Sequence, residues 1–425
     1  MKKNPLLTAL VALLLLAASG CTTAPAAGPA ETPQVIRTET PSASPVMHAT
    51  DENTAANLPE TLPERGEGEA RILFINVGKA DAALIQAGEK NVLIDTGTAE
   101  AAPRLLAALH IMGVERLDAV FLTHTHKDHM GGMEALGQNF SVGELYGAVY
   151  SENKKSGKNA VTELANDLNL PLTRLSAGDV YAMGDGASFT VLGPIEKNQE
   201  DDNDNSLVLM LSVNGRKALF TGDMQLPEED SLLSVETDVR GDVLKVGNHG
   251  NPDATGTAFA HRVLPEIAVV STNTSEDTDS ANPRVIEALG SAKVFITQDF
   301  PVGVLVTVGA DGTLSIGNPA RPAAQAGVLT LGDMDLEKQT VTLENKGADA
   351  DLSGWMLYTD RGDEMLVFPE GTLLPRGGTL TISGTGGGGE ATFPGTEKPF
   401  HKKKADTAML FDRFGNLVCS LSNGM

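Results

Sequence analysis

The sequence of 425 residues predicts an α/β domain followed by a small all-β domain. Between residues 69 and 318, apolar runs of strand length alternate with turn residues and with two helical stretches. Residues 319–326 form a short linker rich in proline and alanine. After this linker, residues 327–425 show only short strand patterns separated by turns. These observations place the boundary between the two domains in the linker.

The first domain contains more strands than helices. Helices are predicted at 99–112, which Gly113 ends, and at 282–289. Strands are predicted at 71–76, 82–85, 91–94, 119–122, 145–148, 189–192, 207–213, 217–223, 243–246, 267–270, 293–296, 303–308 and 313–316. Most of these runs are continuously apolar, which is typical of strands buried on both faces.

The N-terminus has the features of an export signal. Two lysines precede an apolar run at 6–16, which is too short for a typical transmembrane helix. The segment Ala18-Ser-Gly-Cys21 resembles a bacterial lipobox, although that pattern prefers leucine at the place of Ala18. The resemblance implies a signal peptide at 1–21 and a lipid on Cys21, hence a membrane-anchored, extracytoplasmic protein. An ordinary signal peptide cut near Cys21 is the alternative.

Residues 22–68 are predicted to be a disordered tether. They are rich in Ala, Pro, Thr, Ser and Glu, and such a segment buries too little apolar surface to offset the entropy of ordering it. The formal net charge of −24 argues against broad, unspecific binding to nucleic acid or anionic membrane. A phosphate substrate remains compatible, because bound divalent cations reverse the local field. Cys21 and Cys419 are the only cysteines, so the chain has no disulfide framework.

Residues 123–132 concentrate the side chains that bind metals. His124 and His126 follow an apolar strand and lie two positions apart, so both side chains leave an extended segment on one side. Asp128 and His129 follow where a helix could begin, with Asp128 near the capping position. One turn could therefore offer two nitrogens to one cation, and an oxygen and a nitrogen to a second. Such donors suit zinc, manganese or iron better than calcium. The alternative is a solvated polar turn.

The pattern His-x-His-x-Asp-His, with Leu122-Thr123 before it and Gly131-Gly132 after it, resembles the signature of the metallo-β-lactamase superfamily. The resemblance implies an αββα sandwich at 69–318 with two divalent metal ions, zinc or manganese. Asp223, at the end of a strand, matches the bridging carboxylate of the family. The implied metal ligands are His124, His126, Asp128, His129, Asp223 and His249.

Three further motifs resemble the family with small departures. Asp81 follows Gly78-Lys-Ala80, where the family has Gly-x-Gly, and Asp95 begins an Asp-Thr-Gly motif. In the family both carboxylates lie near the metals, more often as supports than as ligands; plain turn aspartates are the alternative. His249 lies in Gly-Asn-His-Gly, where the competence-protein branch has His-His-Gly, so Asn248 replaces the first histidine.

The segment Asn205-Ser-Leu-Val-Leu209 resembles the hydrolase domain of ComEC-type DNA-uptake (competence) proteins. Many other branches have a metal-binding histidine near this point, but no histidine occurs between His129 and His249. Asn205, Ser206, water or a substrate oxygen could fill that place, and Asp204 is another candidate ligand. Asn205 and Ser206 are also the predicted substrate contacts. The rest of the acidic run 199–206 could equally be a solvated loop.

The second domain resembles the lamin-tail domain, an immunoglobulin-like β-sandwich. Strands are predicted at 340–343, 355–358, 365–368, 379–382, 408–411 and 417–419. The resemblance rests on Asp351-Leu-Ser-Gly-Trp355, on the turn at 374–377 and on residues 406–415. It places Trp355 in the core and leaves the partner of this domain unknown.

The resemblances together imply a metal-dependent hydrolase outside the cytoplasm, with a phosphodiesterase or nuclease acting on DNA as the first candidate. In this reading a hydroxide activated by two metals attacks phosphorus, and Asp128 and Asp223 are the catalytic carboxylates. A surface hydrolase of phosphorylcholine, teichoic-acid or lactone substrates is one alternative. A non-catalytic surface binding or scaffold protein is the other, because the middle histidine is missing and Asn248 departs from the family.

Overall fold

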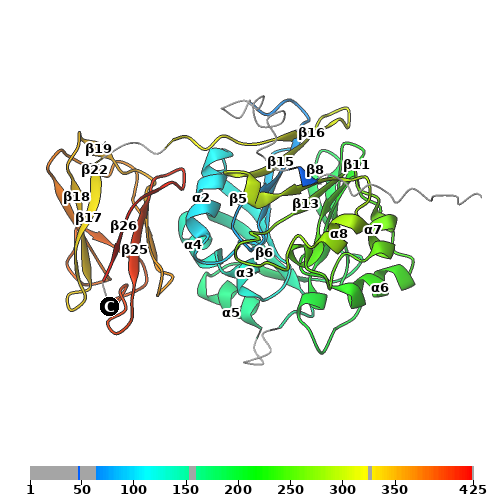
Figure 1. Ribbon diagram of the computed structural model, residues 1–425, viewed down its shortest axis with the longest axis horizontal. Helices are drawn as coiled ribbons and strands as arrows, with labels where there is room; N and C mark the ends of the chain where they lie inside the picture. Colours follow the sequence, from blue (N-terminus) through cyan, green and yellow to red (C-terminus); the bar gives the residue numbers. More distant parts are fainter. Residues whose placement is uncertain (1–45, 48–63, 153–158, 324–327, 424–425) are drawn as a thin grey trace, which may run out of the picture. The chain divides into compact units, whose positions relative to one another are not determined.

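The computed structural model describes residues 46–47, 64–152, 159–323 and 328–423 (Figure 1). The predicted signal peptide with Cys21 lies outside the described residues, and so does most of the predicted tether. Among the residues that are described, no helix combines the length and the apolar character needed to cross a bilayer.

The first domain contains two sheets of eight strands each. The first sheet has the order β16-β15-β2-β3-β4-β5-β6-β7. Its strands are β2 (Ala70–Ile75), β3 (Ala83–Ala87), β4 (Lys90–Ile94), β5 (Arg116–Leu122), β6 (Ser141–Ala148), β7 (Leu172–Leu175), β15 (Gly303–Val308) and β16 (Leu314–Gly317). Strands β4 to β7 run parallel, and the remaining neighbours are antiparallel.

The second sheet has the order β1-β14-β13-β12-β11-β10-β9-β8. Its strands are β1 (Val46–Met47), β8 (Val180–Gly184), β9 (Ala187–Gly193), β10 (Val208–Val213), β11 (Arg216–Phe220), β12 (Val243–Lys245), β13 (Ile267–Val270) and β14 (Lys293–Ile296). Strands β11 to β14 run parallel. Each sheet therefore has a parallel segment, which needs helical connections on its outer face.

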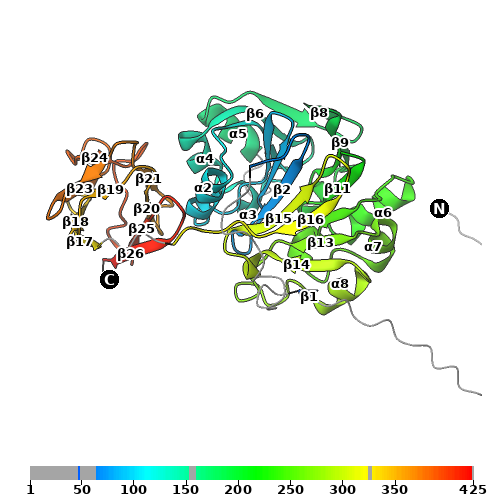
Figure 2. The ribbon, with the colours of Figure 1, turned by 90° about the horizontal axis from the view of Figure 1, so that it is seen from above.

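Helices cover the outer face of each sheet, so the domain is an αββα sandwich (Figures 1 and 2). The first sheet carries α2 (Ala102–Ile111), α4 (Met133–Asn139) and α5 (Ala160–Asp167); the second carries α6 (Leu226–Ser234), α7 (Thr257–Val263) and α8 (Pro283–Ala288). The alternation of side chains along a strand explains the layering. In β2, Ile72 and Phe74 join the core between the sheets, whereas Leu73 and Ile75 pack under the helices.

The metal-binding residues predicted from the sequence lie just after the ends of strands. Asp95 follows β4, and His124 and His126 follow β5 in the first sheet; Asp223 follows β11 and His249 follows β12 in the second. The carboxyl ends of parallel strands lie at one edge of a sheet, so these loops gather at one edge of the sandwich.

The C-terminal domain is all-β, as the sequence predicts. Its strands are β17 (Leu329–Asp335), β18 (Thr340–Asn345), β19 (Ala350–Asp351), β20 (Met356–Thr359), β21 (Met365–Val367), β22 (Leu373–Leu374), β23 (Thr379–Ser383), β24 (Ala391–Thr392), β25 (Thr407–Phe411) and β26 (Leu417–Ser422). Two sheets of four strands and a pair of short strands enclose one apolar core. Trp355 belongs to that core and is 3% exposed. This packing is consistent with a β-sandwich.

Candidate metal centre

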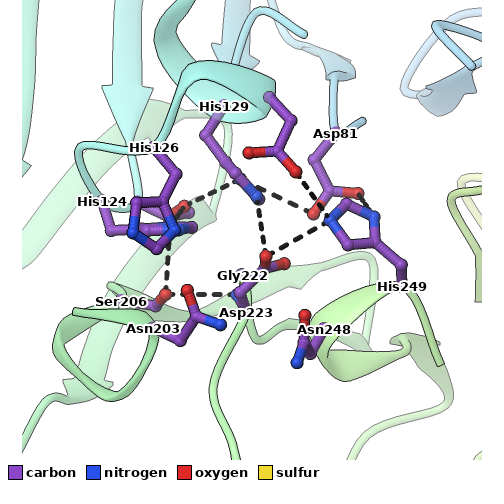
Figure 3. Close-up of polar contacts among 12 residues, drawn as sticks. Asp81, His124, His126, His129, Asn203, Ser206, Gly222, Asp223, Asn248 and His249 are labelled. Carbon is purple, nitrogen blue, oxygen red and sulfur yellow. Dashed lines mark hydrogen bonds and ion pairs between the residues drawn. The ribbon is translucent and has the colours of Figure 1, made fainter. Parts of the chain in front are cut away.

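Side chains from both sheets converge at this edge of the sandwich (Figure 3). Asp81, His129, Asp223 and His249 are all buried, and each offers one ligand atom to a group in which these atoms lie within 4.8 Å of one another. Asp81 and His129 come from loops of the first sheet, whereas Asp223 and His249 come from loops of the second. The centre therefore bridges the two halves of the sandwich.

Asp95 fixes the orientation of His129. The Nδ1 atom of His129 lies 2.8 Å from Asp95 Oδ2, and its Nε2 lies 3.1 Å from Asp223 Oδ2. Asp95 also accepts hydrogen bonds from the backbone N–H and the hydroxyl of Thr123, both at 2.8 Å. Burial lowers the pKa of His129, but Asp223 and Asp95 outweigh it and hold that pKa well above its ordinary value. A fixed acceptor at Nδ1 leaves Nε2 free to bind a cation.

His249 is held by backbone geometry and by a backbone acceptor. It adopts a left-handed conformation with φ of 54°, and its Nδ1 lies 2.8 Å from the carbonyl oxygen of Ser271. Its Nε2 lies 3.2 Å from Asp223 Oδ2 and 3.4 Å from Asp128 Oδ2. Burial lowers the pKa of His249, but the carboxylates of Asp223 and Asp81 outweigh it and raise that pKa to about 9.

His124 and His126 form the second group of donors, beside the first. His124 Nε2 lies 3.0 Å from His126 Nδ1, as their spacing in the sequence predicts. The Nδ1 atom of His124 lies 3.2 Å from the hydroxyls of both Thr123 and Ser206. Burial and the neighbouring His129 hold the pKa of His124 well below its ordinary value. His124 is buried but His126 is exposed, so solvent reaches the centre from the His126 side.

Asp128 lies beside the buried group of donors. It is the second residue of α3 (Lys127–Met130), whose capping residue is His126. Its Oδ2 atom lies 2.8 Å from the ammonium of Lys79 and 3.4 Å from His249 Nε2. Lys79 is partly exposed and comes from the loop between β2 and β3.

Two glycines allow the close packing of these loops. Gly222 has a φ of +51°, and a Cβ there would lie 2.9 Å from Ser206 Cβ and 3.0 Å from Thr123 Cβ. A Cβ on Gly132 would collide with the carbonyl oxygen of Thr96. At each of these two glycines the added Cβ would lie closer to a neighbouring atom than Cβ atoms normally do. Any larger residue would therefore move the loops that carry the donors.

The acidic loop before β10 is mostly buried. Asn205 is committed within this loop: its Oδ1 accepts from the Asn198 N–H at 2.8 Å, and its Nδ2 donates to Asp202 Oδ1 at 3.1 Å. Ser206 instead faces the centre, where its hydroxyl contacts His124 and accepts from the Asp223 N–H at 3.1 Å. The structure thus brings Ser206 to the histidines, whereas the amide of Asn205 is bonded within its own loop. That either residue contacts a substrate stays a prediction.

Sequence reasoning missed three contributors to the centre. Lys245 is 4% exposed, contacts the carboxylate of Asp81 and lies 3.8 Å from Asp223 Oδ1. The Ser271 carbonyl that holds His249 has no side-chain signal in the sequence. Asp202 accepts from the hydroxyls of Thr125 and Ser151 at 2.8 and 2.7 Å and so ties the acidic loop to the histidine loop.

Comparison with known proteins agrees with this geometry. Residues 75–274 match the profile of the metallo-β-lactamase superfamily. These residues form a metallo-β-lactamase domain. The chain is 28% identical over 241 residues to ComE operon protein 3 of Bacillus subtilis (strain 168), which covers 52% of this chain and 30% of that protein. It is 31% identical over 215 residues to competence protein ComA of Neisseria gonorrhoeae, which covers 50% of this chain and 28% of that protein.

The chain spans less than a third of the length of either relative. Among solved structures, the metallo-β-lactamase fold protein YhfI of Bacillus subtilis matches 59% of this chain and 100% of its own, with 15% identity and a TM-score of 0.39. The matches to the two competence relatives confirm the resemblance predicted from Asn205–Leu209, whereas the lamin-tail resemblance stays a prediction.

The donors of the metallo-β-lactamase domain fit divalent cations. Buried polar atoms are almost always hydrogen-bonded, so each exception calls for an explanation such as a bound ion. Four such exceptions in the described part of the chain are Asp81 Oδ1, His129 Nε2, Asp223 Oδ1 and His249 Nε2. These four residues are the members of the buried group. Imidazole and carboxylate together suit zinc or manganese.

Proposed function

We propose that this protein is a membrane-anchored, extracytoplasmic phosphodiesterase that hydrolyses DNA with two divalent cations, zinc or manganese. The observation that carries the proposal is the convergence of imidazoles and carboxylates from both sheets on one buried point, where Asp81 Oδ1, His129 Nε2, Asp223 Oδ1 and His249 Nε2 make no hydrogen bond. A structural core would instead satisfy those atoms or replace them with apolar groups.

In the proposed centre, His124 and His126 would hold one cation, and Asp128, His129 and His249 would hold the other. The carboxylate of Asp223, which contacts His129 and His249, would be shared between them. Bound divalent cations would supply Lewis acidity and lower the pKa of a water molecule toward neutrality. The partners Asp95, Ser271 and Ser206 keep each imidazole in the orientation that this requires.

The open side of the centre suits an anionic substrate. His126 is exposed, and the partly exposed ammonium of Lys79 lies beside Asp128. The chain as a whole carries a formal charge of −24, so local cations are needed to attract a phosphodiester. Lys79 adds one such charge, and its pKa is raised: burial lowers it, but Asp128 outweighs burial.

DNA is the first candidate substrate because of the branch of the superfamily. The segment Asn205–Leu209 resembles DNA-uptake proteins, and the two relatives are named for the ComE operon and for competence. The proposed place outside the membrane rests on the lipobox-like segment that ends at Cys21.

The test is hydrolysis by purified protein reconstituted with manganese or zinc, on linear and circular DNA, RNA, bis-p-nitrophenyl phosphate, a phosphorylcholine ester and a lactone. We expect hydrolysis of DNA by the wild type and its loss in Asp128→Ala and Asp223→Ala with a folded protein. His261→Ala and Asp230→Ala, on the exposed faces of α7 and α6, are the matched controls.

Full activity after thorough chelation would overturn the metal-dependent mechanism, and preference for the phosphorylcholine ester or lactone would overturn DNA as substrate. A chain that purifies with fewer than about two cations and hydrolyses nothing would support the scaffold alternative.

A further inference from the structure

With His124, His126 and the shared carboxylate of Asp223, this cation would have three protein ligands, and an octahedral ion such as Mn²⁺ has room for a further donor. Within 130–248 the sequence contains no histidine. The loop before β10 borders His124 through Ser206, whose hydroxyl lies 3.2 Å from His124 Nδ1. The replacement donor should therefore come from this loop.

Most candidate ligand atoms of this loop already accept hydrogen bonds from other groups of the protein. Asp204 accepts from the Gln225 N–H at 3.0 Å with one oxygen and from Asn198 Nδ2 at 2.9 Å with the other. The amide of Asn205 is bonded at its oxygen and at its nitrogen within the loop. The carboxylate of Asp202 is taken up by Thr125 and Ser151.

Asn203 is the exception in this loop. Its Oδ1 atom is buried and has no hydrogen-bond partner among the described residues. Leaving a buried amide oxygen unpaired is unfavourable, so a partner for it is expected. The same condition holds for Asp81 Oδ1, His129 Nε2, Asp223 Oδ1 and His249 Nε2, which form the metal group, and for side-chain oxygens of Asn318, Thr330 and Thr359, which lie outside this loop. Asn203 therefore has the same signature as the proposed ligands.

The position of Asn203 agrees with this signature. Figure 3 shows its side chain beside Ser206, with the amide oxygen turned toward the pair His124 and His126. Asn203 opens the short 3₁₀ turn Asn203–Asn205, and its backbone N–H donates to Asp201 Oδ1 at 3.1 Å. The adjacent Asp202 bonds to Thr125, the residue between the two histidines, so loop and histidines are fixed relative to each other.

We propose that the side-chain amide oxygen of Asn203 is a further protein ligand of the cation held by His124, His126 and the shared Asp223. This inference rests on the proposed two-cation centre. An amide oxygen is neutral and harder than imidazole, so it binds zinc less strongly than a third histidine and shifts the site toward manganese. The two cations are then held unequally: tightly at Asp128, His129, Asp223 and His249, and weakly at the site with Asn203.

The test is a calorimetric titration of the metal-free full chain with Mn²⁺. Elemental analysis counts the metal ions bound at saturation. The wild type should show two binding steps of different affinity. Asn203→Ala should weaken only the weaker step, by at least about tenfold. Asn203→Asp, which keeps the shape and adds a negative charge, should tighten that same step. Asn166→Ala, on the exposed face of α5, is the matched control and should change neither step.

The possible failures are distinguishable. A wild type that binds no Mn²⁺ contradicts the proposed function as a whole. A wild type with two steps that Asn203→Ala and Asn203→Asp both leave unchanged contradicts only the role of Asn203. Unchanged binding with a raised KM for phosphodiester in Asn203→Ala would assign the amide to the substrate instead and also overturn the inference. Circular dichroism shows whether each variant folds, and the opposite shifts of the two variants keep the result independent of general destabilisation.

Discussion

The ammonium of Lys245 lies against the carboxylate of Asp81, and both side chains are buried beneath the candidate metal centre. Lys245 also donates to the Gly222 carbonyl at 2.8 Å and lies 3.8 Å from Asp223. A protein cation is thus built in among buried carboxylates. It reduces the repulsion between them before any metal binds.

Lys245→Met should therefore destabilise the metal-free protein by about 3–5 kcal/mol, because it leaves buried carboxylates without their cation. Saturating Mn²⁺ should recover part of this loss, since the bound ion supplies positive charge at the same place. Urea denaturation with EDTA and with Mn²⁺ measures both effects. Lys217→Met removes an exposed pair with Asp238 and should cost less than about 1 kcal/mol. Equal costs for the two variants would contradict the role of Lys245.

Ser206→Ala should lower metal affinity by about 10–100-fold while the fold is retained. The hydroxyl touches His124 Nδ1 and accepts from the Asp223 N–H, so its loss releases two donors from their fixed orientation. Calorimetric Mn²⁺ titration measures the effect. Ser231→Ala removes a hydroxyl that donates to the Pro227 carbonyl within α6, makes no contact with the donors of the centre, and serves as control. Wild-type affinity in Ser206→Ala would show that the hydroxyl does not position these donors.

Removing the metal should lower thermal stability. A ligand present at 100 times its dissociation constant stabilises the folded state by about 2.7 kcal/mol. Thermal unfolding with EDTA and with saturating Mn²⁺ should thus give a clear difference in Tm for the wild type. The difference should shrink or vanish in Asp223→Ala, whose carboxylate contacts both His129 and His249. An undiminished difference in that variant would mean that the cation binds elsewhere.

Glu228 should make the protein less stable as the pH rises through neutrality. Burial raises the pKa of Glu228 from 4.5 to about 7, opposed by a hydrogen bond from the Ile195 N–H at 2.8 Å. Because the folded-state pKa is the higher one, no penalty exists well below pH 4.5; it grows as the pH rises from about 4.5 to 7 and then levels off. Relative to Glu228→Gln, the wild type should lose on the order of 2–3 kcal/mol between pH 5 and about 8. A constant difference across that range of urea denaturations would refute this.

The lipid anchor is testable in cells. We expect radiolabelled palmitate to enter the wild-type protein and to be absent from Cys21→Ala. Cys419→Ala is the matched control and should keep the label. Failure of the wild type to incorporate palmitate would leave an ordinary signal peptide as the explanation of the N-terminal segment.

The sequence predicts the frame of the candidate centre because each donor directly follows a run of buried apolar residues. Such runs identify strands, and ligands at the carboxyl ends of parallel strands must come together. Asp95 after β4 and Asp223 after β11 follow this logic. The αββα arrangement itself came from the resemblance carried by His124 to His129, since the apolar runs alone do not fix the order of strands.

Other features could not be read from the chain. In β8 (Val180–Gly184) only one residue is buried, so the strand lacks an apolar pattern. The predicted helix at 99–112 begins later, at Ala102, with Pro103 in its first turn. The run at 199–206 resembled a solvated loop, but Asp202 is buried because Thr125 and Ser151, distant in sequence, bond to it. Such partners appear only in three dimensions.

The donors of the candidate centre are divided between the two sheets, and this has a kinetic consequence. His129 and Asp128 are carried by one sheet, Asp223 and His249 by the other, and the core between the sheets lies directly behind them. A cation bound by donors of both sheets would hold the two sheets together, because they could separate only after the cation had left. The lifetime of the folded protein would then be set by the rate of ion loss, and a chelator would shorten that lifetime as well as remove the metal-dependent activity.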